Sequence, residues 1–358
     1  MEIKKKNLLW ACLFPLCYMV ILWNLVPFVY GIVDDRTMME VVSGQYLGTP
    51  DPHTIFIGYW YSCLLAGLYR LAPGADWYAL GFLALQGGCL GLMAYRLLEK
   101  KRDVKERLFF GALLLLLALV LGVRTAAQIT FTTTAAVLAV TVLFWYMTTE
   151  QLKVRDLVIL FFLCFLTAEA RFPVYCMILP VCGVLWLFRA REKRSLLVPV
   201  IAGAGLALHL IGMFVGYRSE GWRAYNEYND VCTVIFDYKD YTFPRYEDAT
   251  ELYNQVGVFE KVRAKNLYYY NYTADDQVDP QFFSEYLELR KAMVKESRDP
   301  AVRLFGSLKT YVQNVLTGEY GYGHLLALIG CGVLVLWHAR KKEWKSILRV
   351  CGVNGAQF

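Results

Sequence analysis

The sequence predicts an all-α polytopic membrane protein with about eight transmembrane helices. Of its 358 residues, 57% are hydrophobic and only 19% are charged, whereas soluble domains carry about 25% charged residues. Several apolar runs reach the roughly 17–25 residues that cross about 30 Å of hydrocarbon. Lys and Arg gather at the ends of these runs, so the net charge of +6 indicates contact with membrane lipid and no nucleic-acid partner.

Nine apolar segments are candidates for membrane spans. They are Leu8–Val33, Thr54–Leu71, Trp77–Leu98, Leu108–Gly122, Gln128–Met147, Leu157–Thr167, Val174–Phe188, Leu196–Tyr217 and Gly323–His338. Nine crossings would put the basic loops Glu99–Arg107 and Arg189–Arg194 outside, against the positive-inside bias. If Thr54–Leu71 instead lies in the outer leaflet or re-enters it, both loops become cytoplasmic. The sequence therefore predicts eight spans in a bacterial plasma-membrane protein whose N-terminus is cytoplasmic.

This topology divides the chain into three parts. A transmembrane module covers residues 1–217 and includes a first outer loop at 34–76. An extracytoplasmic region follows at 218–322, and residues 323–358 form the last span and a basic cytoplasmic tail. The outer region is rich in Tyr, and Ala249–Leu267 and Pro280–Lys295 have the pattern of amphipathic helices. Its aromatic side chains could stack on sugar rings or serve only as packing, and both interpretations stay open.

The first outer loop begins with two adjacent carboxylates in "GIVDDRTMMEVVSGQYLGTPDPH". Carboxylates at a membrane boundary are costly unless they are hydrated, paired or used. Asp34 and Asp35 could end the first span or cap the next helix, with Glu40 in its first turns. A capping role accounts for one of the two aspartates. It accounts less well for an adjacent pair in a loop that returns to the membrane.

The order of parts in this region resembles the GT-C superfamily of integral-membrane glycosyltransferases, such as protein O-mannosyltransferases and lipid A aminoarabinose transferases. Those enzymes follow their first span with an acidic pair that opens an amphipathic helix, as "DDRTMMEVVSG" does here. A Pro-containing return, "GTPDPHTIF", and a second membrane-parallel segment, "GYWYSCLLAGLYRLAPGADWY", complete a match over Met1–Val123. "SGQYLGTPDPH" is also similar to uncharacterised multi-spanning proteins of Gram-positive bacteria, which implies no activity.

The resemblance implies that a sugar is transferred from a polyprenyl-phosphate donor to a glycan, lipid or protein acceptor on the extracytoplasmic side, as in cell-envelope polysaccharide biosynthesis. An acceptor hydroxyl has a pKa far above 7, so a carboxylate must take its proton. Asp34 matches the first acidic residue of the family and is the expected base, and Asp35 matches the second and would help it. No cofactor is expected, and a divalent metal is not favoured, because "VRTAAQITFTTT" lacks the carboxylates that metal-using relatives carry there.

A leaving phosphate also needs a cation, and the planar fork of Arg suits it. The topology places Arg70, Arg124 and Arg171 at the outer face. Each has an alternative role, since Arg124 could snorkel to headgroups, Arg171 could pair with Glu169, and Arg70 could anchor the interfacial helix. Further residues expected around the substrate are Arg36, Glu40, His53, Gln128 and Glu169.

Four alternatives stay open beside this prediction, two for single histidines and two for the function of the protein. His53 could bond locally instead of touching substrate, and His209 has the position of a packing residue within a span. A transporter or flippase of lipid-linked saccharide would have similar linings but should show repeat symmetry near the midplane. A non-catalytic partner in envelope assembly would not need Asp34 or Asp35.

Overall fold

The structure, a computed structural model, describes residues 2–99, 111–112, 115, 118, 123–149, 151–188, 195–272, 275, 278–296 and 300–317. Most of Leu108–Gly122 and all of Gly323–His338 lie outside these residues, as do Arg189–Arg194 and most of Glu99–Arg107. Within the described part the fold is helical apart from one pair of two-residue strands. This confirms the predicted all-α class.

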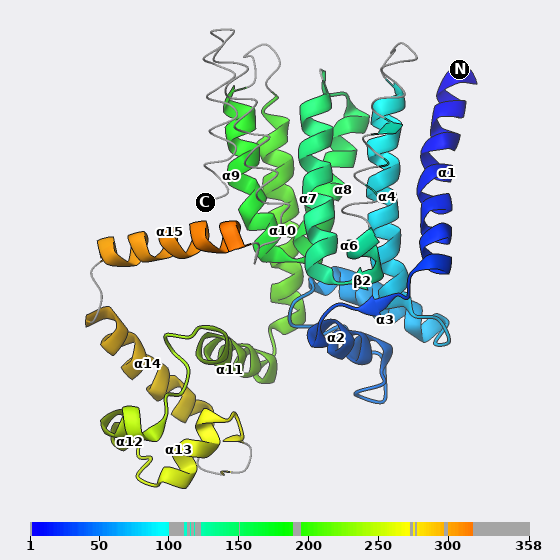
Figure 1. Cartoon of the computed structure of the whole chain (residues 1–358). Helices are drawn as coiled ribbons and strands as arrows, with labels where there is room; N and C mark the ends of the chain where they lie inside the picture. The colour runs from blue at the N-terminus through cyan, green and yellow to red at the C-terminus, as the bar shows by residue number, and fades with distance from the viewer. Residues whose placement is uncertain are drawn as a thin grey trace. The chain divides into compact units, whose positions relative to one another are not determined.

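The described residues fall into two compact units, one that ends at Gly216 and one that begins at Tyr217. The first unit contains a bundle of long helices that run side by side (Figure 1). These helices are α1 (Glu2–Leu25), α4 (Trp77–Glu99), α7 (Phe131–Thr148), α8 (Val154–Ala170), α9 (Phe172–Phe188) and α10 (Leu197–Tyr217). The core of the bundle is centred on α4, α7 and α8.

Four described helices are long and apolar enough to cross a membrane. They cover Asn7–Leu25, Trp77–Glu99, Phe131–Thr148 and Leu197–Tyr217, and α9 is apolar but shorter. Each of the four coincides with a predicted span, so the fold is compatible with a membrane protein. The first span is shorter than predicted, because α1 ends at Leu25 and Pro27 follows it, where proline has no N–H to continue a helix.

Two short strands fasten the loop after α1 to the bundle. Strand β1 (Val29–Tyr30) pairs in parallel with β2 (Gln128–Ile129), which follows the short helix α6 (Val123–Ala127). The Gly31 amide extends the pairing by donating to the Ile129 carbonyl at 3.0 Å. A Cβ at Gly31 would lie 2.2 Å from a methyl carbon of Thr130, so only glycine allows this approach. The start of α2 is thereby held beside the start of α7.

Helices α2 (Val33–Ser43) and α3 (Tyr59–Leu71) lie at the end of the bundle where α1 ends and α4 begins (Figure 1). Helix α2 ends at Gly44, whose φ of +82° is a left-handed C-cap conformation. Helix α3 is shorter than the predicted segment Thr54–Leu71 and begins after Gly58. These two helices, with the start of α4, form the region that contains the acidic pair.

The second unit consists of helices of 3 to 18 residues around an aromatic core. Its elements are α11 (Glu220–Asp237), η3 (Tyr246–Asp248), α12 (Thr250–Gln255), α13 (Lys261–Tyr268), α14 (Pro280–Glu296) and α15 (Pro300–Thr317). The predicted helix Pro280–Lys295 corresponds to α14. The predicted helix Ala249–Leu267 is wrong as a single element, because Gly257 with a φ of +73° separates α12 from α13.

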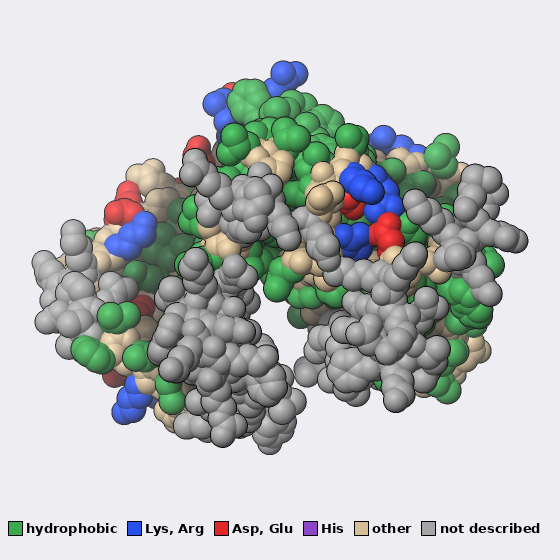
Figure 2. Space-filling model, turned by 90° about the horizontal axis from the view of Figure 1, so that it is seen from above, with side chains coloured by type: hydrophobic (Ala, Val, Ile, Leu, Met, Phe, Trp, Pro, Cys, Tyr) green, Lys and Arg blue, Asp and Glu red, His purple; other side chains and the backbone are tan. Residues whose placement is uncertain are grey.

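Ion pairs mark the opposite end of the bundle from α2 and α3. Arg155 donates to the Glu99 carboxylate at 3.0 Å, and Arg96 pairs with the same carboxylate. Figure 2 views the molecule from this end and shows a small group of Lys or Arg and Asp or Glu side chains among hydrophobic ones. Under the predicted topology this is the cytoplasmic end.

Candidate functional site

Asp35 is buried at the point where α2, α4 and α7 meet. One oxygen of its carboxylate, Oδ1, accepts a hydrogen bond from the Tyr78 hydroxyl at 2.8 Å and another from the Phe131 amide at 3.0 Å. That amide belongs to the first turn of α7, where helix N–H groups have no partner within the helix. Asp35 therefore caps a helix other than its own, while its own helix has Ile32 at the N-cap without a side-chain bond.

The second oxygen of the Asp35 carboxylate, Oδ2, is buried and has no hydrogen-bond partner in the described part of the chain. Burial and repulsion from Asp34 raise the pKa of Asp35, while the two hydrogen bonds and the charge of Arg171 lower it. The net result is a pKa of about 6, compared with an ordinary value of 3.8. A buried carboxyl that titrates close to neutrality is a frequent sign of a functional site.

Arg171 brings a cation to the same place from the junction of α8 and α9. Its guanidinium carbon lies 4.9 Å from the ring centroid of Phe56 and 4.8 Å from that of Phe131, within the range of cation–π attraction. Among the described residues this guanidinium makes no hydrogen bond or ion pair. Burial lowers the pKa of Arg171, and the nearby carboxylates Asp34 and Asp35 raise it again. An arginine stays protonated at neutral pH under such conditions.

Asp34 is the exposed member of the acidic pair. It lies in the first turn of α2, where the helix dipole favours a negative charge. Its carboxylate acts on the pKa values of both Asp35 and Arg171, and it has no side-chain partner within the described ranges. As far as the described residues go, the site thus contains an exposed carboxylate and a guanidinium whose N–H donors make no hydrogen bond.

Three tyrosines from different elements, Tyr30 of β1, Tyr69 of α3 and Tyr78 of α4, support the site together with Asp76, which directly precedes α4. Asp76 accepts hydrogen bonds from the hydroxyls of Tyr69, at 2.9 Å, and Tyr30, and it also accepts from the Ala79 amide at 3.0 Å. The Tyr69 hydroxyl in turn accepts from the Tyr78 amide at 3.1 Å. This network fixes the helix turn that carries Tyr78, so the hydroxyl that contacts Asp35 is held in place.

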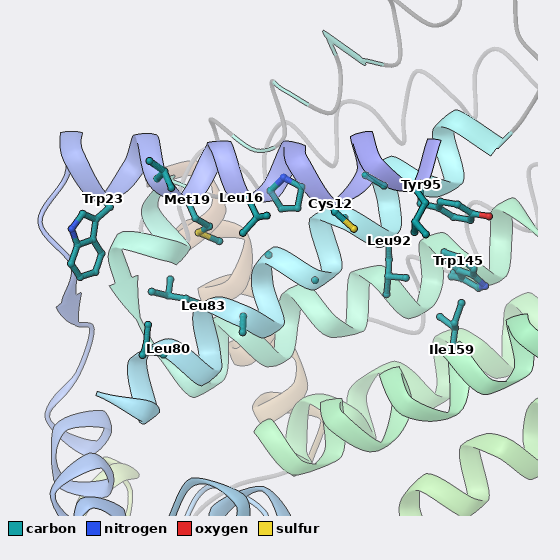
Figure 3. A pocket seen from close by; sticks show the side chains of 18 of the residues that line it. Cys12, Leu16, Met19, Trp23, Leu80, Leu83, Leu92, Tyr95, Trp145 and Ile159 are labelled. Atoms are coloured by element: carbon teal, nitrogen blue, oxygen red, sulfur yellow. The ribbon is translucent and has the colours of Figure 1, made fainter. Parts of the chain in front are cut away.

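An apolar groove with a volume of about 1170 Å³ runs between α1 and α4. Figure 3 shows Cys12, Leu16, Met19 and Trp23 of α1 on one side, and Leu80, Leu83 and Leu92 of α4 on the other. Three glycines of α4 also line the groove, Gly87, Gly88 and Gly91, and a Cβ on Gly91 would lie 2.9 Å from the Ala11 carbonyl oxygen of α1. One end of the groove includes Phe28, two residues before Tyr30, and Leu80, two residues after Tyr78. The other end includes Arg155.

The predicted alternative of an Arg171–Glu169 pair does not occur, because Glu169 has other partners. The Glu169 carboxylate is fully buried, contacts the His209 ring nitrogen Nδ1 at 2.9 Å and accepts from the Tyr61 amide at 2.9 Å. It sits at the N-terminus of α3, and a Cβ on Gly58 would lie 2.4 Å from one of its oxygens. His209 is buried and stacks on Phe172 at 4.7 Å, as expected of a packing residue. Glu169 therefore holds α3 in place.

Four of the other predicted substrate contacts have partners of their own in the first unit. Arg36 pairs with Glu40 at 3.0 Å on α2. Arg70 donates to the Pro50 carbonyl at 2.8 Å. His53 contacts Asp51 at 2.7 Å and the Gly216 carbonyl at 3.1 Å, Gln128 is an exposed residue of β2, and the side chain of Arg124 is outside the described part.

Sequence reasoning did not identify Tyr78, Phe56 and Phe131 as neighbours of the acidic pair. Tyr78 and Phe131 each begin a long apolar helix, where aromatic residues are common at membrane interfaces for other reasons. No local signal separates such a residue from one that contacts a carboxylate far away in the sequence.

The described residues contain no group of three His, Cys, Asp or Glu side chains arranged to hold a metal ion. No protein-family model, curated protein or solved structure matches the chain.

We expect Asp35→Asn to raise the apparent midpoint of thermal unfolding in detergent at pH 7.5, and the gain to shrink as the pH falls toward 4. A carboxyl whose folded-state pKa, about 6, lies above its ordinary 3.8 contributes stability only at low pH. That contribution declines as the pH rises through 6, because the folded state binds the proton more tightly. Asparagine imitates the neutral form and removes this decline.

The matched control is Asp230→Asn, an exposed carboxylate of α11, which should change stability by less than about 0.5 kcal/mol. If Asp35→Asn unfolds at a lower temperature than wild type at pH 7.5, the ionised carboxylate stabilises the folded state and the pKa of Asp35 is not raised.

Proposed function

We propose that the protein is a glycosyltransferase of the GT-C type that transfers a sugar from a polyprenyl-phosphate donor to an acceptor on the extracytoplasmic side of the membrane. The observation that carries the proposal is the uncommitted, half-buried guanidinium of Arg171 near the exposed carboxylate of Asp34. Sugar transfer from a phosphate carrier needs this combination, a cation for the leaving phosphate and a base for the acceptor.

In the proposed reaction the acceptor oxygen attacks the anomeric carbon as the bond from that carbon to the phosphate oxygen breaks. Asp34 takes the proton of the acceptor hydroxyl, and polyprenyl phosphate leaves with the electron pair of the broken bond. In-line displacement inverts the anomeric centre. Arg171 offers the phosphate two parallel N–H donors, which are stronger than neutral hydrogen bonds and fix its orientation.

Asp35 acts through the groups around it. Its contacts with Tyr78 and the Phe131 amide tie the start of α2 to α4 and α7. Phe131 also packs against the guanidinium of Arg171. The Asp35 carboxylate therefore connects α2, which carries the base, with the residue of α7 that contacts the cation. Rigid helices that hold the base and the cation in place matter because a displacement of about 1 Å in a reacting group can greatly lower the rate.

The groove between α1 and α4 suits the hydrocarbon part of a donor of this kind. Its lining is almost entirely apolar, and its volume of about 1170 Å³ is somewhat larger than the usual range for ligand sites, about 300–1,000 Å³. Its end at Phe28 and Leu80 adjoins the strand and helix turn that carry Tyr30 and Tyr78. A chain in the groove would place its phosphate at the end of the bundle that contains the acidic pair.

The proposal retains the predicted eight-span topology, in which that end of the bundle faces outward. If that end of the bundle faced the cytoplasm instead, the site could not use donors that are presented at the extracytoplasmic face of a bacterial plasma membrane. The acceptor would be a glycan, a lipid or a protein of the cell envelope.

The test is turnover of lipid-linked sugars by the purified protein in liposomes. A panel of polyprenyl-phosphate monosaccharides is supplied with a mixture of envelope glycan acceptors, and released polyprenyl phosphate is measured by mass spectrometry. We expect release above that of protein-free liposomes for at least one donor. Movement of intact donor across the bilayer without cleavage would indicate a transporter, and neither cleavage nor movement would indicate an assembly partner.

A further inference from the structure

The second unit carries a pocket that is separate from the proposed transferase site. It has a volume of about 290 Å³ and lies between η3 and one face of α13. Lys261, Lys265 and Tyr268 come from that face, since positions three and four apart on a helix are neighbours. Arg245, Tyr246 and Glu247 line the side that η3 provides.

The charges of the pocket are predominantly positive. Its lining has three cations and one carboxylate, Glu247, which pairs with Lys261. A second carboxylate, Asp248, lies outside the lining but near enough to Arg245 to raise its pKa, as the Tyr268 hydroxyl also does. Among the described residues Lys265 has no ion-pair partner. An anionic group that entered the pocket would meet the ammonium of Lys265, which no described carboxylate pairs with.

Aromatic rings make up the rest of the lining. The guanidinium carbon of Arg245 lies 6.0 Å from the ring centroid of Tyr268, and the Tyr246 hydroxyl donates to the Phe259 carbonyl at 3.2 Å. Tyr268 and Tyr269 contact each other edge to face at 5.0 Å. Tyrosine rings held in this way offer apolar faces and hydroxyl groups together, which suits a ligand with both C–H faces and hydroxyls.

We propose that this pocket binds an acidic saccharide, a sugar that carries a carboxylate or phosphate group. The cations would hold the acidic group, the tyrosine rings would contact the sugar ring, and Glu247 would accept from a hydroxyl. The volume of about 290 Å³ is just below the usual range for ligand sites, about 300–1,000 Å³, so the pocket suits one or two sugar units. The inference does not depend on the proposed transferase activity.

The test measures binding by isothermal titration to the full-length protein in nanodiscs of zwitterionic phospholipid. The probes are tetragalacturonate, the neutral galactotetraose, glucose 6-phosphate and inorganic phosphate. We expect tetragalacturonate or glucose 6-phosphate, or both, to bind at least about tenfold more tightly than galactotetraose and inorganic phosphate. Binding of tetragalacturonate would identify a carboxylate as the acidic group that the pocket recognises, and binding of glucose 6-phosphate would identify a phosphate.

The charge reversal Lys265→Glu should weaken this binding at least about tenfold, and Lys265→Arg should restore most of it. Lys291→Glu is the matched control on α14, and Arg171→Gln, which disables the proposed carrier site, should leave acidic-sugar binding in place. Binding that is lost in Arg171→Gln and kept in Lys265→Glu would overturn the proposal. Equal affinity for neutral sugar, equal affinity for inorganic phosphate, or no binding at millimolar concentration would also overturn it.

Discussion

Asp34→Asn is expected to lower the rate of polyprenyl-phosphate release by about 10²–10⁴-fold, the usual contribution of a general base. Asparagine fits the space of the carboxylate but cannot take the acceptor proton. Because Asp34 is exposed and makes no side-chain contact within the described residues, the protein should fold normally. The first-turn charge of α2 is worth about 0.3–1 kcal/mol, too little to explain such a loss through unfolding.

Two controls separate this effect from a general one. Asp230→Asn removes an exposed carboxylate from α11 in the second unit and should keep the wild-type rate. Donor affinity, measured by quenching with a labelled carrier lipid, should change little in Asp34→Asn because the base contacts the acceptor. If Asp34→Asn keeps its rate and Asp35→Asn loses it at equal stability, Asp35 is the base, and if both keep it the transferase proposal fails.

Arg171→Gln is expected to reduce kcat/KM for the donor by about 10²–10³-fold, the usual effect of removing one group that stabilises transition-state charge. The negative charge on the phosphate grows as the bond to the sugar breaks, so the loss should appear mainly in kcat. Arg171→Lys keeps the charge but lacks the planar fork, so its kcat/KM should lie between those of wild type and Arg171→Gln. The measurement is a donor titration at saturating acceptor.

The matched control for this variant is Arg223→Gln, which removes an exposed arginine of α11 and should leave both kinetic parameters unchanged. A fall in kcat/KM for Arg171→Gln that arises from KM alone would show a binding contact with no part in the chemical step. Unchanged kinetics would remove Arg171 from the site and, with it, the observation that carries the proposed function.

The sequence predicted the helical class and the positions of the four described helices that are long and apolar enough to cross a membrane, because both follow from composition and from the length of apolar runs. It also led to the prediction that the acidic pair belongs to a site, with Arg171 as one of three candidate cations, and this stays a prediction. It predicted α1 too long, through Pro27 to Val33, since apolar character alone does not show where a helix ends. It also joined α12 and α13, because the amphipathic pattern continues across Gly257.

Only the tertiary structure distinguished the two aspartates. Asp34 and Asp35 are adjacent and chemically identical, yet one is exposed and the other contacts Tyr78 and the Phe131 amide, 43 and 96 residues away. It also paired Glu169 with His209 and placed Arg171 against the rings of Phe56 and Phe131, with no hydrogen bond or ion pair to its guanidinium among the described residues. Burial, hydrogen bonds and pKa depend on neighbours that are distant along the chain. The sequence therefore determined which residue types the site contains, and the packing of α2, α4 and α7 decided what each of them contacts.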